Sequence, residues 1–130
     1  MIGMYAEHSS AFLRVLAVLT GVLFSVPLFF APLAWARMFQ WSVEARSDLA
    51  LYFGRCLGAF ALIMSCTAWY VAQHHELQPL VFAILTAFSA LMVVVHIVGA
   101  IQKVQPWTET AEIPFWSALT VLGLAFFPVS

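Results

Sequence analysis

Four long apolar stretches fill most of the chain, and short polar segments separate them. A membrane-spanning helix needs about 20 predominantly apolar residues. Within hydrocarbon every backbone amide must bond inside its own segment, so such stretches cross a membrane as helices. Only 8% of the residues are charged, whereas soluble domains average roughly a quarter. We therefore expect lipid to be the solvent for most of this chain.

The four stretches predict an all-α fold, an integral membrane four-helix bundle that runs antiparallel, up-down-up-down, in a single domain of residues 1–130. The expected helices cover about residues 11–33, 48–72, 80–102 and 113–128, because short connections favour antiparallel neighbours. We expect the first stretch to be retained rather than cleaved as a signal peptide. The amino-terminal segment carries Glu7 and only one basic residue, Arg14, and the apolar run is longer than a usual signal core.

Local signals mark the ends of these helices. Ser9 and Ser10 are candidate caps of the first helix, and Ser47 or Asp48 of the second, because short polar side chains accept from free N–H groups there. Pro27 predicts a kink in the first helix, with its freed carbonyl satisfied by neighbouring groups.

Three polar segments connect the stretches. Trp35 and Phe39 introduce the polar stretch of residues 37–48, which contains Trp41. Aromatic residues beside the first charges predict an interfacial belt, and part of this stretch is expected to form a short helix on the membrane surface. In the second connection, His74, His75 and Glu76 predict a solvated turn rather than a metal site, and Pro79 suits the first turn of the third helix. The third connection, residues 103–112, ends near the positive dipole end of the fourth helix.

Basic residues suggest an orientation. The first and third connections hold Arg37, Arg46 and Lys103, with Arg55 close by, whereas the opposite side holds Arg14. The positive-inside rule then places the first and third connections in the cytoplasm and both termini outside. We expect an integral membrane protein, in a bacterial inner membrane.

The second helix carries a stripe of small residues at spacings of three and four. Its members are Gly54, Gly58, Ala61 and Ser65, followed by Ala68 and Ala72. Small residues let helix backbones approach closely in lipid, and Gly54 with Gly58 forms a GxxxG pair. The stripe predicts close packing inside the bundle, which we favour, or the seam of a homodimer.

Two ionisable side chains lie inside the apolar stretches, and such groups are candidate functional sites. Arg55 and His96 each lie about six residues from the same side, roughly 9 Å deep at 1.5 Å per residue. Arg55 alone is explained by a side chain that extends to the interface. His96 alone is explained by a neutral imidazole bonded to a backbone carbonyl. The sharper interpretation is a polar pocket that both residues share.

This pocket would lie among the second, third and fourth helices. Ser89 shares the polar face of His96, and the rim would hold Trp107, Glu109, Glu112 and Trp116. Such a pocket suits an amphipathic ligand, a quinone or a bound lipid, with its head group at Arg55 and His96.

The sequence does not contain the residues that several classes of membrane protein require. No Asp or Glu lies deep in a stretch, as a proton-coupled small multidrug exporter requires, and Cys56 and Cys66 stand ten residues apart, too far for the thiol pair of a vitamin K epoxide reductase. A b-haem would need a second deep histidine besides His96. The net charge of −1 gives no footprint for nucleic acid. We expect no metal and no catalytic constellation.

From the second helix onward, over roughly residues 50–125, the chain resembles the four-helix membrane scaffolds of sterol C-4 demethylation. The shared features are Arg55 followed by Gly58, the histidine turn before Leu80, His96 and Pro114. The early proline and the Arg-x-x-Gly segment are also similar to DoxX-like membrane proteins. Gly99 and Ala100 stand where the scaffold family tends to place an acidic residue after the histidine. The scaffold resemblance implies a non-catalytic role in holding membrane enzymes together; the DoxX resemblance implies quinone or redox chemistry.

We therefore expect a non-catalytic scaffold or accessory subunit for membrane enzymes, in contact with lipids and with a membrane-protein partner or a second copy. The alternative is a lipid- or quinone-binding redox subunit that uses the Arg55/His96 pocket. A pore is disfavoured, since no helix has a continuous polar face.

Overall fold

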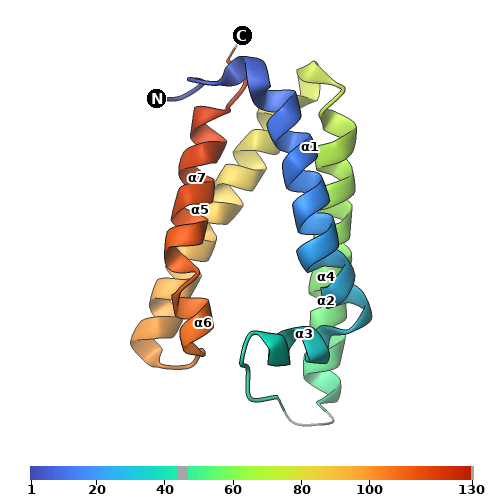
Figure 1. Cartoon of the computed structure of the whole chain (residues 1–130), viewed down its shortest axis with the longest axis vertical. Coiled ribbons are helices and arrows are strands. Elements are labelled where there is room, and N and C mark those ends of the chain that lie inside the picture. The colour runs from blue at the N-terminus through green and yellow to red at the C-terminus, as the bar shows by residue number, and fades with distance from the viewer. Residues whose placement is uncertain (44–46, 130) are drawn as a thin grey trace. The chain divides into compact units, whose positions relative to one another are not determined.

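The computed structural model describes residues 1–43 and 47–129, and its regular elements there are all helical (Figure 1), which confirms the all-α class. Arg46, one of the residues used for orientation, lies outside the described residues. The elements follow in the order η1 (Ala6–His8), α1 (Ser9–Thr20), η2 (Gly21–Ser25), α2 (Val26–Phe30), α3 (Pro32–Met38), α4 (Asp48–Val71), η3 (His75–Leu77), α5 (Gln78–Gln102), α6 (Trp107–Thr110) and α7 (Ile113–Ala125).

Among the described residues, three helices are long and apolar enough to cross a membrane: Ala6–Phe30, Asp48–Val71 and His75–Gln102. They are the helices expected of an integral membrane protein. The fourth helix, α7, has only 13 residues. At 1.5 Å per residue it is about 20 Å long, short of the roughly 30 Å hydrocarbon core of a bilayer. It ends at Ala125, before the predicted limit at residue 128.

The chain divides into two compact units. Unit 1 holds Met1–Phe12 and Val71–Ser130, with η1, α5, α6 and α7. Unit 2 is Leu13–Tyr70, with most of α1, the turn η2, and the helices α2, α3 and α4.

The first predicted helix is continuous over Ala6–Phe30 but is not α-helical throughout. A π-helical turn, η2, separates α1 from α2, and the helix ends at Phe30 rather than Leu33. Ala31 breaks it with φ −137° and ψ 55°, and Pro32 starts the short helix α3. The apolar pattern ran through this break because the residues on both sides of it are hydrophobic.

The π turn accommodates Pro27. Proline has no N–H, and its ring would press on the carbonyl four residues earlier, that of Leu23. In η2 the N–H of Val26 instead donates to Gly21, five residues back, which widens the turn. The Leu23 carbonyl accepts from the indole Nε1 of Trp35 at 3.4 Å. The disturbance predicted at Pro27 is thus a wider turn whose freed carbonyl is bonded by a side chain.

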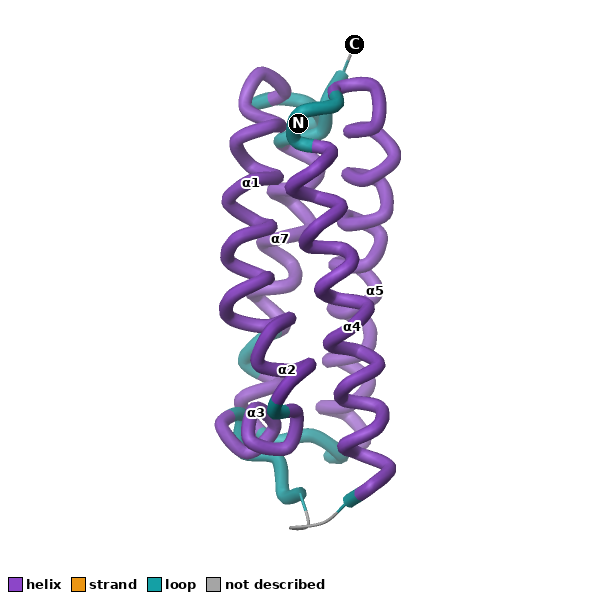
Figure 2. The backbone as a smooth tube through the Cα atoms, turned by 90° about the vertical axis from the view of Figure 1, so that its right-hand side faces the viewer, coloured by secondary structure: helices purple, strands orange, loops and turns teal. Residues whose placement is uncertain are grey.

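Helix α3 lies across the end of α4: it runs sideways in Figure 1 and is seen end-on in Figure 2. The short helix expected within residues 37–48 therefore occurs earlier, at Pro32–Met38. Helix α4 begins after Ser47, whose Oγ accepts from the Ala50 N–H at 3.3 Å. This bond confirms Ser47 as the cap of α4.

Helix α4 runs alongside the first helix in unit 2, and two glycines allow the close approach. A Cβ atom at Gly58 would lie 2.6 Å from the Cα of Phe29, and one at Gly54 would meet the ring of Pro32. Phe29 and Pro32 both belong to the first apolar segment of the same chain, so the two glycines pack within one molecule. Ala61, one turn beyond Gly58, is half-buried.

One turn further, Ser65 joins α4 to α1 and η2 through hydroxyl groups. Its Oγ lies 3.0 Å from Thr20 Oγ1 and 3.1 Å from Ser25 Oγ. Thr20 also donates to the Leu16 carbonyl, and Ser25 to the Thr20 carbonyl. The three hydroxyls are therefore satisfied without water.

In unit 1, α5 and α7 run antiparallel and pack side by side (Figure 1). Gly123 of α7 faces Thr86 of α5, and a Cβ there would meet the threonine hydroxyl. Phe82 is fully buried and stacks on Phe12 with ring centroids 5.7 Å apart. Phe12 also stacks on Phe126 at 4.8 Å. Aromatic packing thus closes the end of unit 1 near the chain termini.

The two ends of the chain are bonded to each other in unit 1. The N–H groups of Gly3 and Tyr5 donate to the carbonyls of Leu124 and Ala125 at 2.9 and 2.8 Å. Ser9 Oγ lies 2.7 Å from the Phe126 carbonyl oxygen and 2.6 Å from the Ala6 carbonyl oxygen, so these two acceptors share its one proton. Ser9 was predicted to be a helix cap; this was wrong, because the hydroxyl donates to carbonyls instead of accepting from an N–H.

Large apolar side chains on the long helices point outward. In the most apolar 18 residues of each candidate span, 22% are buried in Ala6–Phe30, 11% in Asp48–Val71 and 22% in His75–Gln102. Leu19, Phe60 and Leu91, for example, are 52%, 52% and 63% exposed. A soluble bundle would turn these side chains inward, so the distribution fits a lipid-facing surface.

Candidate functional site

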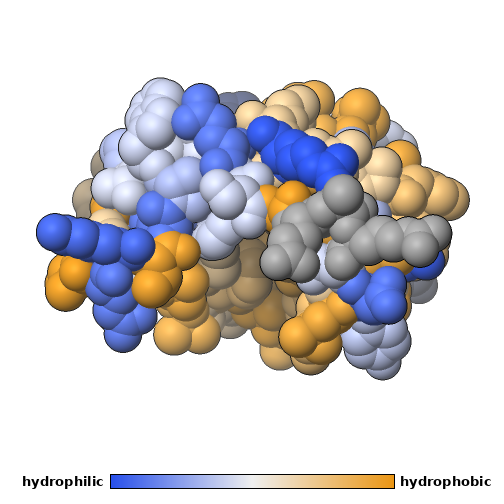
Figure 3. Space-filling model, turned by 90° about the horizontal axis from the view of Figure 1, so that it is seen from below, coloured by the Kyte–Doolittle hydropathy of each residue, from blue (hydrophilic) through white to orange (hydrophobic). Residues whose placement is uncertain are grey.

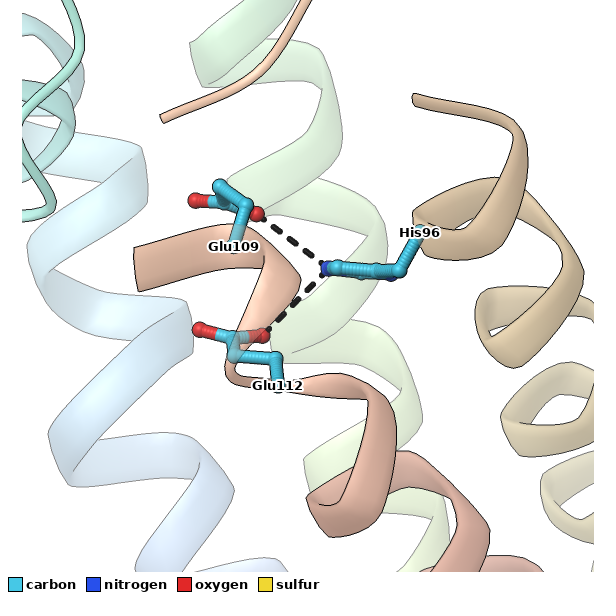
Figure 4. Close-up of side chains that lie close together, drawn as sticks. All are labelled: His96, Glu109 and Glu112. Carbon is cyan, nitrogen blue, oxygen red and sulfur yellow. Dashed lines mark hydrogen bonds and ion pairs between the residues drawn. The ribbon is translucent and has the colours of Figure 1, made fainter. Parts of the chain in front are cut away.

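His96, Glu109 and Glu112 meet in unit 1 where α5, α6 and α7 converge (Figure 4). We call these three residues the His96 cluster. The imidazole points between the two carboxylates, with Nε2 3.2 Å from Glu109 Oε2 and 3.6 Å from Glu112 Oε2. The side chains are 3%, 14% and 25% exposed, respectively. Ionisable groups this well covered at the end of a membrane helix are costly and mark a candidate site.

The orientation of His96 is set by its own helix. Its Nδ1 lies 2.7 Å from the backbone carbonyl oxygen of Met92, one turn earlier. A carbonyl oxygen only accepts, so Nδ1 carries a proton. In the neutral imidazole the lone pair is then on Nε2, which faces the carboxylates. The predicted bond from the imidazole to a backbone carbonyl is therefore present at Nδ1. The other ring nitrogen, Nε2, faces the two glutamate carboxylates, which was not predicted.

The two glutamates reach the imidazole from the segment that links α5 to α7. Glu109 lies in α6, and Glu112 immediately precedes α7. Residues three apart share one face of a helical turn, so both carboxylates point the same way. Trp116, one turn into α7, donates from Nε1 to Glu112 Oε2 at 3.0 Å.

Burial raises the pKa of the Glu112 carboxyl above its usual value, and the neighbouring Glu109 carboxylate raises this pKa further. The hydrogen bond from Trp116 and the proximity of His96 act in the opposite direction without cancelling the rise. The charged form of Glu112 is therefore less favourable here than at an exposed position.

The loop that carries the glutamates is itself tied to α5. Gln105 donates from Nε2 to the His96 carbonyl at 3.0 Å and to Thr110 Oγ1 at 3.1 Å. Lys103 ends α5 in a left-handed conformation, with φ 56°. Gly99 leaves room for the Gln105 side chain, because a Cβ there would collide with its amide. The loop of residues 103–112 is thus fixed against the end of α5.

Aromatic rings lie along one side of the cluster. Trp116 lies beside His96 with ring centroids 6.1 Å apart and meets Phe88 edge-on at 5.8 Å. Ser89, on the same buried face of α5, donates to the Leu85 carbonyl at 2.8 Å. Its hydroxyl is thus bonded within the helix.

The structure brings together most of the predicted rim around His96. Glu112 and Trp116 adjoin His96, whereas Trp107 is 68% exposed. Arg55 is exposed on α4 in unit 2. The pocket shared by Arg55 and His96 therefore stays a prediction.

The two glutamates were predicted at the rim of a pocket, and their direct contact with His96 was not predicted. The signal was present in the spacing of Glu109 and Glu112, which places both on one face of a turn directly before a helix. Gln105 was also missed. No pattern in the sequence marks a side chain that folds back onto the helix before it.

A second polar region lies at the other end of unit 1. An open hollow there is lined by Glu7, His75 and Glu76, together with Ala6, Gln78, Pro79, Phe127, Pro128 and Val129. Its acidic residues and His75 are exposed, as expected of a solvated turn.

No protein-family model, curated protein or solved structure matches this chain. The resemblances to sterol-demethylation scaffolds and to DoxX-like proteins therefore stay predictions.

Proposed function

We propose that this chain is a non-catalytic accessory or scaffold subunit for membrane enzymes, and that its partner docks on the loop between α5 and α7. The observation that carries the proposal is the way this loop is held. The polar loop of residues 103–112, which includes the short helix α6, is fastened to the end of α5 by partly buried contacts from Gln105, Glu109 and Glu112 to His96. Ordered loops of this kind provide rigid surfaces for recognition.

The outer side of the same loop presents apolar side chains. Val104 and Trp107 are 62% and 68% exposed. Figure 3 shows hydrophobic side chains among hydrophilic ones on the face seen from below. Exposed tryptophans on a rigid support are typical anchors of protein interfaces, because they bury much area at little entropic cost. The loop thus combines a fixed backbone with an anchor for a partner.

Native mass spectrometry of the protein, purified in mild detergent from its own host, tests this proposal. We expect a co-purifying membrane protein that is lost in Trp107→Ala and kept in Trp69→Ala, which removes an exposed tryptophan of α4. Equal recovery of the partner with both variants, or no partner with the wild type, would contradict docking on this loop.

We further propose that α7 is a fourth span, with the bilayer thinned locally around its 13 residues, and that it completes an antiparallel bundle in a bacterial inner membrane. The bonds from Gly3 and Tyr5 to the end of α7 support this topology, because they place both termini together. Gln78, at the second connection, bonds to Ser10 at the same end of unit 1. An even number of spans gives this arrangement, and the basic residues favour cytoplasmic first and third connections.

The second candidate is an amphipathic ligand, a lipid or a quinone, whose head group meets His96. The aromatic side formed by Trp116 and Phe88 favours it, since apolar rings beside a polar group are typical of such sites. Solvent extraction of purified protein tests this candidate. A stoichiometric amphiphile that is lost in His96→Ala supports it, and an empty bundle with a protein partner excludes it.

A further inference from the structure

The atoms of the His96 cluster are spaced like ligands around a small cation. One ligand atom from each residue lies within 4.8 Å of the other two. Nε2 is 3.2 Å from one carboxylate oxygen and 3.6 Å from the other. Two ligands at about 2.0–2.1 Å from a tetrahedral ion lie roughly 3.3 Å apart. Two edges of a coordination tetrahedron are therefore already formed.

The groups behind the three residues match the surroundings of metal ligands. A metal-binding histidine usually donates its other ring N–H to a carbonyl or carboxylate, which fixes the tautomer that ligates. His96 does so through Nδ1 and the Met92 carbonyl, at 2.7 Å. Glu112 is held by the indole of Trp116 at 3.0 Å. Both ligands are thus oriented before any ion arrives.

We propose that His96 Nε2 and the carboxylates of Glu109 and Glu112 bind one divalent transition-metal ion of the zinc class. One imidazole nitrogen and two carboxylate oxygens form a borderline set, which suits Zn²⁺ and neighbouring first-row ions better than soft Cu⁺. A divalent ion with two carboxylates and a neutral imidazole has no net charge. A neutral complex lowers the cost of keeping these groups out of water.

The ion would join α5 to α6 and to the start of α7, because its ligands come from all three places. Three protein ligands leave one tetrahedral position open for water or for a donor atom from outside the chain. Metal binding does not depend on whether a partner docks on the loop, so either proposal can fail alone.

Zinc titration of the full-length protein in detergent, after chelator treatment, tests the site. The background is the double variant His74→Ala, His75→Ala, which removes two histidines of the turn at the other end of unit 1. We expect one Zn²⁺ per chain by calorimetry and by metal content. Glu109→Gln and Glu112→Gln should each weaken binding at least about tenfold, whereas Glu76→Gln, an exposed matched control, should leave it unchanged.

Absence of Zn²⁺ binding in that background, or equal affinity in the two cluster variants and the control, would overturn the proposal. X-ray absorption of the zinc-loaded protein provides a readout that needs no cluster variant. We expect one imidazole and only nitrogen and oxygen ligands. Sulfur coordination would assign the ion to Cys56 or Cys66 instead and would also overturn the proposal.

Discussion

Glu112 uses one carboxylate oxygen for two contacts, since Oε2 accepts from Trp116 and lies 3.6 Å from the His96 imidazole. The residue is also covered and close to Glu109, and these two effects raise its pKa. Because the folded state raises this pKa, the carboxyl contributes stability while it is protonated. That contribution is lost as the pH rises through the raised pKa.

For the metal-free protein, we therefore expect Glu112→Gln to raise the thermal midpoint by a few degrees above pH 7. The amide keeps an acceptor for Trp116 but removes the charge whose burial is unfavourable. The gain should shrink toward zero near pH 4, where the wild-type carboxyl is protonated. Thermal unfolding in detergent with a chelator, followed by fluorescence across this pH range, measures it.

Glu76→Gln is the control, because its carboxyl is exposed in a turn of the same unit. Its midpoint should follow the wild type at every pH. A Glu112→Gln midpoint below the wild type at pH 8 would show that the charged form stabilises the fold, contrary to the burial argument.

Gly58 gives a second prediction at a single position. A methyl group there would meet the backbone of Phe29 at 2.6 Å from its Cα, and backbone cannot rotate aside. We expect Gly58→Ala to cost about 1–3 kcal/mol, and Gly58→Leu to prevent assembly. Gly21→Ala is the matched control, because the nearest atom, Ser65 Cβ, would be at an ordinary 3.9 Å.

Heating followed by size-exclusion chromatography in detergent compares these variants. Identical melting of Gly58→Ala and the wild type would mean that α4 and the first helix do not approach as closely as described.

Hydroxyl groups on the first helix and on α4 bond to each other and so fix how the two helices align. Ser65 meets Thr20 and Ser25, and each of these also bonds to a backbone carbonyl. Loss of one hydroxyl thus leaves its neighbours bonded. Hydrogen bonds of this kind between membrane helices average roughly 0.6 kcal/mol.

A double-mutant cycle of Ser65→Ala and Thr20→Val measures the contact between the helices. We expect a coupling energy of about 0.6 kcal/mol and single-variant costs no larger than about 1.5 kcal/mol. A coupling of zero would indicate that the two hydroxyls do not bond in the membrane. Ser117→Ala is the control for generic effects, since Ser117 donates to the Ile113 carbonyl within α7.

Sequence patterns predicted the elements well where periodicity and composition decide them. Helix α4 begins at Asp48 behind Ser47, and Pro79 stands in the first turn of α5, as expected. The break at Ala31 was missed, because a change in backbone direction among uniformly apolar residues leaves no change in hydropathy. The π turn before Pro27 was missed for a similar reason, since a proline predicts disturbance but not its form.

For the whole molecule, the class of fold followed from one requirement, that long apolar segments satisfy their backbone internally. The candidate site followed only in part. His96 stood out because it is ionisable in an apolar stretch, but its partners lie beyond a loop. Their approach depends on the fold of residues 103–112, in which Gln105 and Gly99 cooperate without any recognisable motif.

Cysteine accessibility tests the proposed topology of the whole chain. In a background without Cys56 and Cys66, we expect His75→Cys to react with a membrane-impermeant maleimide on intact spheroplasts. Val104→Cys should react only after permeabilisation, because α5 would separate the two positions by a full membrane. Labelling of both from one side would exclude α5 as a span, and the reverse pattern would invert the proposed orientation.

The bonds between the two chain ends impose an order on biosynthesis. Ser9 bonds to the carbonyl of Phe126, which lies 117 residues further along the chain. A ribosome that adds about 5–20 residues per second needs roughly 6–23 s to cover that distance. Ser9 therefore waits without its final partner, and this end of unit 1 closes only after Phe126 has been translated.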